Sequence, residues 1–132
     1  QTGASVTQFS GKLYDIYQSP DSADSLSDVN KYAEDTINNC PDDQKTQYAV
    51  AYATFLLRHT TQYDKAIKLL DSVSGKTDDQ DVLGDYYLCY SLLYKANGNQ
   101  SKADEYNQKY VEIINNSKND VTYEAPSSST GN

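Results

Sequence analysis

From residue 48 to residue 73 the chain reads YAVAYATFLLRHTTQYDKAIKLLDSV. Apolar residues recur there at helical spacing, stop at a polar stretch, and resume around an alanine, Ala66. A second stretch, from residue 85 to residue 114, reads DYYLCYSLLYKANGNQSKADEYNQKYVEII and centres on Ala103 in the same way. A helix pair that cannot bury its apolar face alone must stack on a neighbour. The repetition therefore predicts an all-α chain of stacked antiparallel helical hairpins.

Prolines and glycines, with their polar neighbours, divide the chain into paired helices. Gly98 lies in the turn of the last pair, and Asn99 is expected to cap the helix that follows. The first pair has a longer loop than the others, as is common for the terminal unit of a repeat array. The expected helical domain is 1–116, with hairpins at about 5–40, 42–74 and 79–115.

The last part of the chain, residues 117–132, differs in composition from the hairpins. It is rich in Ser and Asn and poor in apolar residues, which predicts a polar extended tail outside the helical domain. The alternation of Val121, Tyr123 and Ala125 would allow a short extended segment that docks on the domain or on a neighbouring subunit.

The two clear hairpins resemble tetratricopeptide repeats. The run YDKAI at residues 63–67 is similar to that family's start of a second helix, and so is Gly98 with Ala103 and Tyr106. Ala66 and Ala103 are 37 residues apart, whereas the family repeat is about 34, and we assign the excess to the linker KTDDQ. The resemblance implies a short right-handed solenoid of about three hairpins and six helices. An unrelated helical bundle is the alternative.

Charge and hydropathy exclude two classes of partner. The formal net charge is −8, and the eleven basic residues form no cluster. A nucleic-acid-binding face needs clustered Lys and Arg, so we expect no nucleic-acid partner. No apolar run approaches the roughly 20 residues that span a bilayer, so we expect no direct membrane insertion of this segment.

The residue types for catalysis or metal binding are sparse. His59 is the only histidine, and the sequence indicates no nucleophile and no orienting acid beside it. One histidine with the separated Cys40 and Cys89 makes a transition-metal site unpromising. We therefore expect no catalytic residue, no metal and no cofactor. The two cysteines are either free thiols or one disulfide.

Tyrosine is the remaining candidate for a binding surface, since the chain contains 13 of them. Tyrosine is enriched at protein interfaces because it combines a large apolar ring with a polar tip. In the resembled family the first helix of each hairpin usually lines the concave side, which implies that tyrosines there face a partner. The candidate interaction residues are Tyr48, Tyr86, Tyr87, Tyr94 and Tyr123.

The compartment is predicted only from composition. The chain begins at Gln1, lacks methionine, and is rich in Ser, Thr, Asn and Tyr. These features favour an extracellular or cell-surface protein whose leader has been removed; a trimmed cytoplasmic protein is the alternative. Asn99 and Asn115 each begin a triplet that fits the N-glycosylation pattern, which matters only for an exported protein.

These observations favour a non-catalytic module that binds another protein. The alternative is a self-assembling subunit of an extracellular filament or surface layer, in which terminal segments bridge neighbouring copies. In both cases the partner is a protein: another chain in the first, and the same chain, as a homo-oligomer or filament, in the second.

Overall fold

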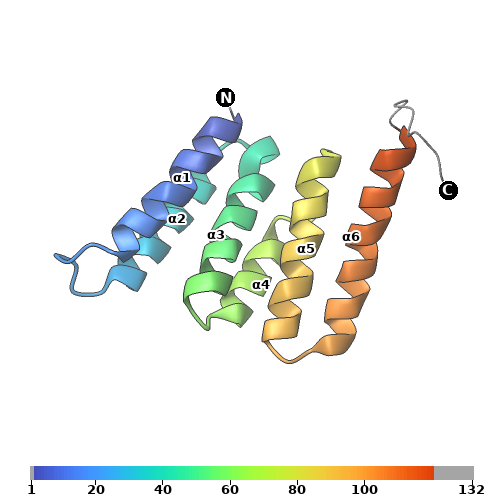
Figure 1. Ribbon diagram of the computed structural model, residues 1–132. Coiled ribbons are helices and arrows are strands. Elements are labelled where there is room, and N and C mark those ends of the chain that lie inside the picture. The colour runs from blue at the N-terminus through green and yellow to red at the C-terminus, as the bar shows by residue number, and fades with distance from the viewer. Residues whose placement is uncertain (1, 121–132) are drawn as a thin grey trace.

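The computed structural model describes residues 2–120, and over this range the fold is all-α (Figure 1). The helices pair into three hairpins, and the hairpins stack side by side into a short solenoid, as the repeats predict. The α-helices are α1 (Thr2–Tyr17), α2 (Ser25–Asn39), α3 (Lys45–His59), α4 (Tyr63–Ser72), α5 (Gln80–Ala96) and α6 (Gln100–Asp120), with a 3-10 turn η1 (Asp42–Gln44) before α3.

The helices lie in two layers. In Figure 1, α1, α3 and α5 lie side by side, α2 and α4 lie behind them, and α6 lies beside α5 at the end of the row. Helix α3 contacts α1, α2, α4 and α5, so it is the centre of the stack. Thr54 of α3 lies 3.7 Å from Cys89 of α5, measured between the hydroxyl oxygen and the sulfur. Thr54 and Cys89 therefore lie at the same level of the two neighbouring helices.

Alanines at the contacts between helices allow the close packing of the stack. Ala33, Ala49, Ala53 and Ala66 are fully buried, and Ala103 is nearly so. A side chain of one methyl group lets two helix backbones approach while larger neighbours fill the space around them. The largest side chains that are fully buried belong to Tyr52, Leu13, Leu56, Leu70, Leu93, Val29 and Thr46.

The turn before α6 matches the sequence prediction in detail. Gly98 has φ +86°, a left-handed conformation that L-amino acids with a side chain rarely adopt. The side-chain oxygen of Asn99 accepts a hydrogen bond of 3.1 Å from the backbone N–H of Lys102, which confirms the predicted cap. Gly75, after α4, also has positive φ, and the carboxylate of Asp79 caps α5.

The predicted end of the helical domain at Asn116 is wrong, because α6 continues to Asp120. Residues 117–120 contain no glycine and no proline. Without a helix-breaking residue, extending an existing helix needs no new nucleus, so polar composition alone does not stop it. Val121, Tyr123 and Ala125 lie outside the described residues, so the predicted docking of this segment stays a prediction.

Candidate functional site

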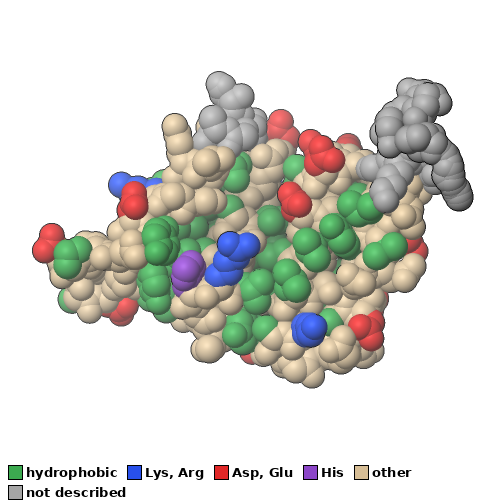
Figure 2. Space-filling view, in the orientation of Figure 1, with side chains coloured by type: hydrophobic (Ala, Val, Ile, Leu, Met, Phe, Trp, Pro, Cys, Tyr) green, Lys and Arg blue, Asp and Glu red, His purple; other side chains and the backbone are tan. Residues whose placement is uncertain are grey.

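One face of the molecule, formed by α1, α3, α5 and α6, displays many hydrophobic side chains (Figure 2). Single exposed apolar residues are normal on a protein surface, whereas a gathering of them marks an interaction surface. The most exposed large apolar residues in the described part of the chain all belong to these four helices: Tyr14 (44% exposed), Leu92 (43%), Val111 (38%) and Ile114 (37%).

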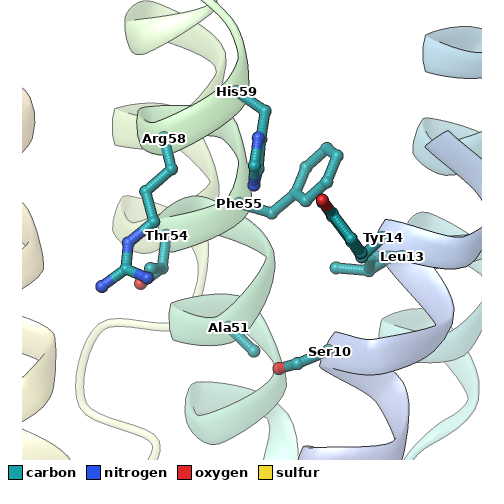
Figure 3. Close-up of a pocket in the computed structure, with 8 residues that line it drawn as sticks. All are labelled: Ser10, Leu13, Tyr14, Ala51, Thr54, Phe55, Arg58 and His59. Carbon is teal, nitrogen blue, oxygen red and sulfur yellow. The ribbon is translucent and has the colours of Figure 1, made fainter. Parts of the chain in front are cut away.

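A pocket of about 350 Å³ opens between α1 and α3 (Figure 3). The buried side chains of Leu13 and Phe55 form its apolar base, and the exposed Tyr14, Arg58 and His59 surround it. Ser10, Ala51 and Thr54 complete the lining. An apolar pocket with a few polar groups is typical of a ligand-binding site.

Aromatic rings hold one wall of this pocket. His59 and Phe55 are one turn apart on α3, and their ring centroids are 4.8 Å apart. From α1, the ring centroids of Tyr14 and Tyr17 lie 5.5 and 5.6 Å from that of His59. The Tyr17 hydroxyl donates a 3.2 Å hydrogen bond to the His59 carbonyl oxygen. These contacts tie the end of α3 to α1 and fix the orientation of the wall.

Arg58 is the positively charged side chain of the pocket. In Figure 3 its guanidinium extends past Thr54, on the side of α3 away from the ring of Phe55. Among residues 5–116, whose side chains the structure describes, the salt bridges are Lys31–Asp35, Lys65–Glu34 and Lys102–Glu105, and none of them involves Arg58. No Asp or Glu lines the pocket. The guanidinium therefore has five donors available to an incoming acceptor.

A second pocket of about 230 Å³ adjoins the first through Ala51, which lines both. It brings in α5 and the N-terminal half of α1, and its walls are mainly small apolar side chains. We call the combined surface the α1–α3–α5 groove. The second pocket is lined by Val6, Gln47, Val50, Ala51, Val82 and Asp85.

Asp85 gives this end of the groove a negative charge. Partial burial, followed by repulsion from Asp81 and Asp79, raises the pKa of its carboxyl above the ordinary value of 3.8. Asp81 and Asp79 lie at the start of α5, where the helix dipole favours acidic groups. The groove therefore has a positive charge, that of Arg58, in one pocket and the negative charges of Asp85, Asp81 and Asp79 in or near the other.

Two of the predicted interaction tyrosines belong to the core, so that prediction is wrong. Tyr48 is 8% exposed and packs against Phe9 of α1, with ring centroids 5.0 Å apart. Tyr86 is 5% exposed, and its hydroxyl donates a 2.9 Å hydrogen bond to the carbonyl oxygen of Leu70 in α4. Both lie on sides of α3 and α5 that face neighbouring helices. Helical spacing in the sequence does not distinguish such a side from one that is open to solvent.

The other predicted tyrosines lie apart from the groove. Tyr87 and Tyr94 are half-buried and surround Tyr106 of α6, with ring centroids 6.2 and 5.7 Å from it. The Lys109 ammonium lies 5.9 Å from the centroid of the Tyr87 ring. Tyr123 lies outside the described residues.

The buried Tyr86 and Tyr90 border a different pocket, of about 620 Å³, between the end of α4 and the α5–α6 pair. At this pocket the Tyr90 hydroxyl donates a hydrogen bond to the carboxylate of Asp71. Burial, and secondly this bond, raise the pKa of Tyr90. The rings of Tyr90 and Tyr106 stack with centroids 4.4 Å apart, so these two faces cover one another. These contacts join the last hairpin to the end of α4.

Sequence reasoning missed the groove residues, although a signal for them was present. Tyr14 lies one turn after Ser10 on α1, outside the apolar stripe that contains Leu13. Ala51 and Arg58 lie two turns apart on α3, and so fall on one side of the helix. A comparison of the solvent-facing positions of α1 and α3, the first helices of neighbouring hairpins, would have identified these residues as parts of one surface.

Both cysteines are free thiols. Cys40 is half-buried after the end of α2, and Cys89 is buried in α5. Burial raises the pKa of both thiols, that of Cys89 to about 11. Within residues 2–120 there is no group of three or more His, Cys, Asp or Glu side chains placed to hold a metal ion. In the same range no helix combines the length and the apolar character needed to cross a membrane.

A family model described as the SusR N-terminal TPR domain matches residues 4–131. The match extends over all three hairpins and confirms the resemblance of the two clear hairpins to tetratricopeptide repeats. Comparisons with curated proteins and with solved structures give no significant match.

Proposed function

Since the chain belongs to the family of SusR N-terminal TPR domains, we propose that it is a non-catalytic module that holds a segment of a partner protein in the α1–α3–α5 groove. Tetratricopeptide repeats mediate protein–protein interactions, and stacked repeats provide extended binding surfaces. The observation that carries the proposal is the pair of adjoining pockets with a shared wall at Ala51. One continuous surface built by three helices suits a peptide better than a small molecule.

Site-specific photo-crosslinking tests this proposal. A photoreactive amino acid replaces Ser10 or Gln47 in the groove, or Lys68, an exposed residue of α4, as the control. In extracts of the native cells we expect the same protein partner to be crosslinked from both groove positions and not from Lys68. Equal crosslinking from all three positions, or from Lys68 alone, would rule out the groove as the binding site.

A blocking substitution provides the second arm. Ala51→Lys places a long side chain where the two pockets meet, whereas Ser101→Lys adds the same charge at an exposed position of α6. Crosslinking should be lost in Ala51→Lys and retained in Ser101→Lys, with the far-UV circular dichroism of both variants unchanged. Retention in both variants would contradict the proposal.

Self-assembly is the second candidate function, favoured by the exposed apolar residues of α6. Val111 and Ile114 are three residues apart, so they lie on one side of this helix and are both partly open to solvent. Light scattering of the full chain over a range of concentrations tests this candidate. An assembling subunit should gain mass with concentration and lose that gain in Val111→Ser/Ile114→Ser. A constant monomer mass would exclude self-assembly.

We also propose an extracellular or cell-surface location, supported by composition alone. The support is the absence of methionine and the abundance of Ser, Thr, Asn and Tyr. Protease treatment of intact native cells tests this location. A surface protein should be degraded while a cytoplasmic marker survives; equal survival of both would contradict the proposal.

A further inference from the structure

The turn between α5 and α6 contains the only Asn-Gly step in the chain, Asn97-Gly98. An asparagine in this position can react with its own backbone, because glycine has no β-carbon that hinders approach to its nitrogen. Both residues are exposed to water, and a β-carbon placed on Gly98 would meet no atom within 4 Å. The surroundings of the turn therefore leave room for a change of backbone conformation at this step.

The reaction that this step allows is deamidation through a cyclic imide. The Gly98 nitrogen attacks the side-chain carbonyl carbon of Asn97 and loses its proton, a carbon–nitrogen bond forms, and the side-chain amide leaves as ammonia. Water then opens the imide at either carbonyl carbon, which gives aspartate or isoaspartate at position 97. The sum is the uptake of one water molecule and the release of one ammonia molecule, and the neutral amide becomes a carboxylate.

The folded chain holds the two reacting groups apart. Asn97 has ψ 5°, so the Gly98 nitrogen lies on the side of the Asn97 backbone nitrogen and not beside the Asn97 side chain. Ring closure therefore requires rotation about the bond between the α-carbon and the carbonyl carbon of Asn97. The Gly98 N–H donates a 3.1 Å hydrogen bond to the carbonyl oxygen of Lys95, and the Asn99 N–H donates a 2.8 Å bond to that of Tyr94. Rotation at Asn97 breaks both bonds.

A third hydrogen bond holds the reacting side chain. The Asn97 side-chain nitrogen donates a 2.8 Å hydrogen bond to the carboxylate of Asp64, in the first turn of α4. Asp64 lies 33 residues before Asn97, so this bond ties the second hairpin to the turn of the third. The carbonyl carbon that would be attacked is therefore held toward α4 until this bond opens.

The turn can open without unfolding of the whole chain. Among the elements within residues 2–120, α6 packs closely on α5 alone. A pocket of about 620 Å³ lies between α6 and the end of α4. Elements held by few contacts open at a lower free energy than the core. Reaction at Asn97 then needs only this local opening.

Both products change the contact with α4. A carboxylate at position 97 has no proton to donate to Asp64, and the two negative charges repel each other. Isoaspartate also inserts an extra carbon into the main chain of a turn that backbone hydrogen bonds close. Asp64 and Asn97 line neither pocket of the α1–α3–α5 groove, so the groove residues stay unchanged.

From these contacts we propose that Asn97 is a site of spontaneous deamidation, restrained by the closed turn and by the bond to Asp64, and that the reaction releases the α5–α6 turn from α4. The substrate is the chain itself, and water is the only co-reactant. The modification is irreversible without a repair enzyme, so it distinguishes an older chain, with a loosened last hairpin, from a newly made one.

Ageing of the full chain in a mildly alkaline buffer tests the site. Mass spectrometry of proteolytic peptides measures deamidation at each asparagine, and labelling by an isoaspartyl methyltransferase measures isoaspartate. A synthetic peptide with the sequence of residues 95–100, KANGNQ, gives the rate without the fold. We expect Asn97 to react first among the asparagines of the chain, and more slowly than in the peptide. No reaction at Asn97, earlier reaction at another asparagine, or equal rates in chain and peptide would overturn the proposal.

A substitution at Asp64 tests the restraint. Asp64→Ala removes the acceptor, and Asp78→Ala removes an equal charge from an exposed position between α4 and α5. Deamidation at Asn97 should be about twofold to tenfold faster in Asp64→Ala, the factor expected for loss of one hydrogen bond, and unchanged in Asp78→Ala. Far-UV circular dichroism checks that both variants fold. An unchanged rate in Asp64→Ala, or equal acceleration in both variants, would rule out the restraint.

Exchange of the two residues tests the consequence. Asn97→Asp reproduces one product, and its thermal unfolding midpoint should be roughly 2–5 °C below that of the wild type. Adding Asp64→Asn restores an amide opposite a carboxylate, with the roles exchanged, and should recover most of this loss. Asn107→Asp, at an exposed position of α6, controls for the added charge. An equal loss in Asn107→Asp, or no recovery in the double variant, would contradict the release of this contact.

Discussion

The hydroxyl of Ser91 donates a 2.7 Å hydrogen bond to the backbone carbonyl oxygen of Ala103, and both residues are buried. The small residue of α5 and the alanine of α6 thus meet inside the last hairpin, where no larger side chain would fit without displacing a helix. Ala66 is fully buried at the corresponding place in α4. These contacts explain why the alanine-centred pattern recurs.

Enlarging either alanine should therefore destabilise the fold. Ala66→Leu and Ala103→Leu are each expected to lower the free energy of unfolding by about 1–3 kcal/mol, because the added carbons have no space in a close-packed core. Ala96→Leu, at an exposed position of α5, is the control and should change it by less than about 0.5 kcal/mol. Urea unfolding followed by circular dichroism measures all three. Equal effects at the three positions would contradict the packing described.

Tyr52 links two hairpins through its hydroxyl, which donates a 2.5 Å hydrogen bond to the side-chain oxygen of Asn30 in α2. Tyr52→Phe should lower the free energy of unfolding by about 1 kcal/mol, because it leaves a partly buried acceptor without its donor. Tyr14→Phe removes an exposed hydroxyl that accepts from Gln18, and it should cost less than about 0.5 kcal/mol. A loss in Tyr14→Phe as large as that in Tyr52→Phe would count against this role.

Replacing Gly11 or Gly98 by alanine should change the stability of the protein in opposite directions. Gly11 lies within α1 with open space around its α-carbon, so Gly11→Ala should stabilise the protein by about 0.5–1 kcal/mol. Gly98 has φ +86°, and Gly98→Ala should destabilise it by about 1–2 kcal/mol through backbone strain. Thermal unfolding distinguishes the two, and the same sign for both would refute the assigned backbone conformations.

Asp85 should make stability depend on pH. Its folded-state pKa is raised, so ionisation of the carboxyl costs stability above that pKa, and the cost is absent below the unfolded value of 3.8. Asp85→Asn should therefore be more stable than the wild type near pH 7, and the difference should disappear towards about pH 3. Asp15→Asn removes one charge from an exposed position of α1 and controls for net charge. A gain that persists unchanged in acid would contradict this account.

The two thiols should react at different rates. Cys89 is buried and has its pKa raised to about 11, so little thiolate forms near pH 8. Iodoacetamide should therefore label Cys40 first in the folded protein and both cysteines in denaturant, as read by mass spectrometry of the peptides. Rapid labelling of Cys89 in the folded state would show that α5 opens readily or packs differently.

Local signals in the sequence were sufficient to predict the hairpins but not to predict which residues form the α1–α3–α5 groove. The Asn99 cap and the Gly98 turn depend on neighbouring residues, so they could be predicted directly. Tyr48 and Tyr86 were predicted to face a partner, yet they are buried. Which side of a first helix remains open depends on where the next hairpin packs, and periodicity does not contain that information. The groove residues Tyr14 and Arg58 became visible only when three helices were placed together.

The stacked rings of Tyr90, Tyr94 and Tyr106 have a spectroscopic consequence. Their centroids lie 4.4 to 5.9 Å apart in nearly parallel planes, and the chain has no tryptophan to mask tyrosine absorption or emission. Rings so close and fixed in a chiral arrangement couple electronically and give the α5–α6 hairpin a near-ultraviolet dichroism signal of its own. Loss of that signal reports the separation of α5 from α6, so the terminal hairpin can be followed without any label.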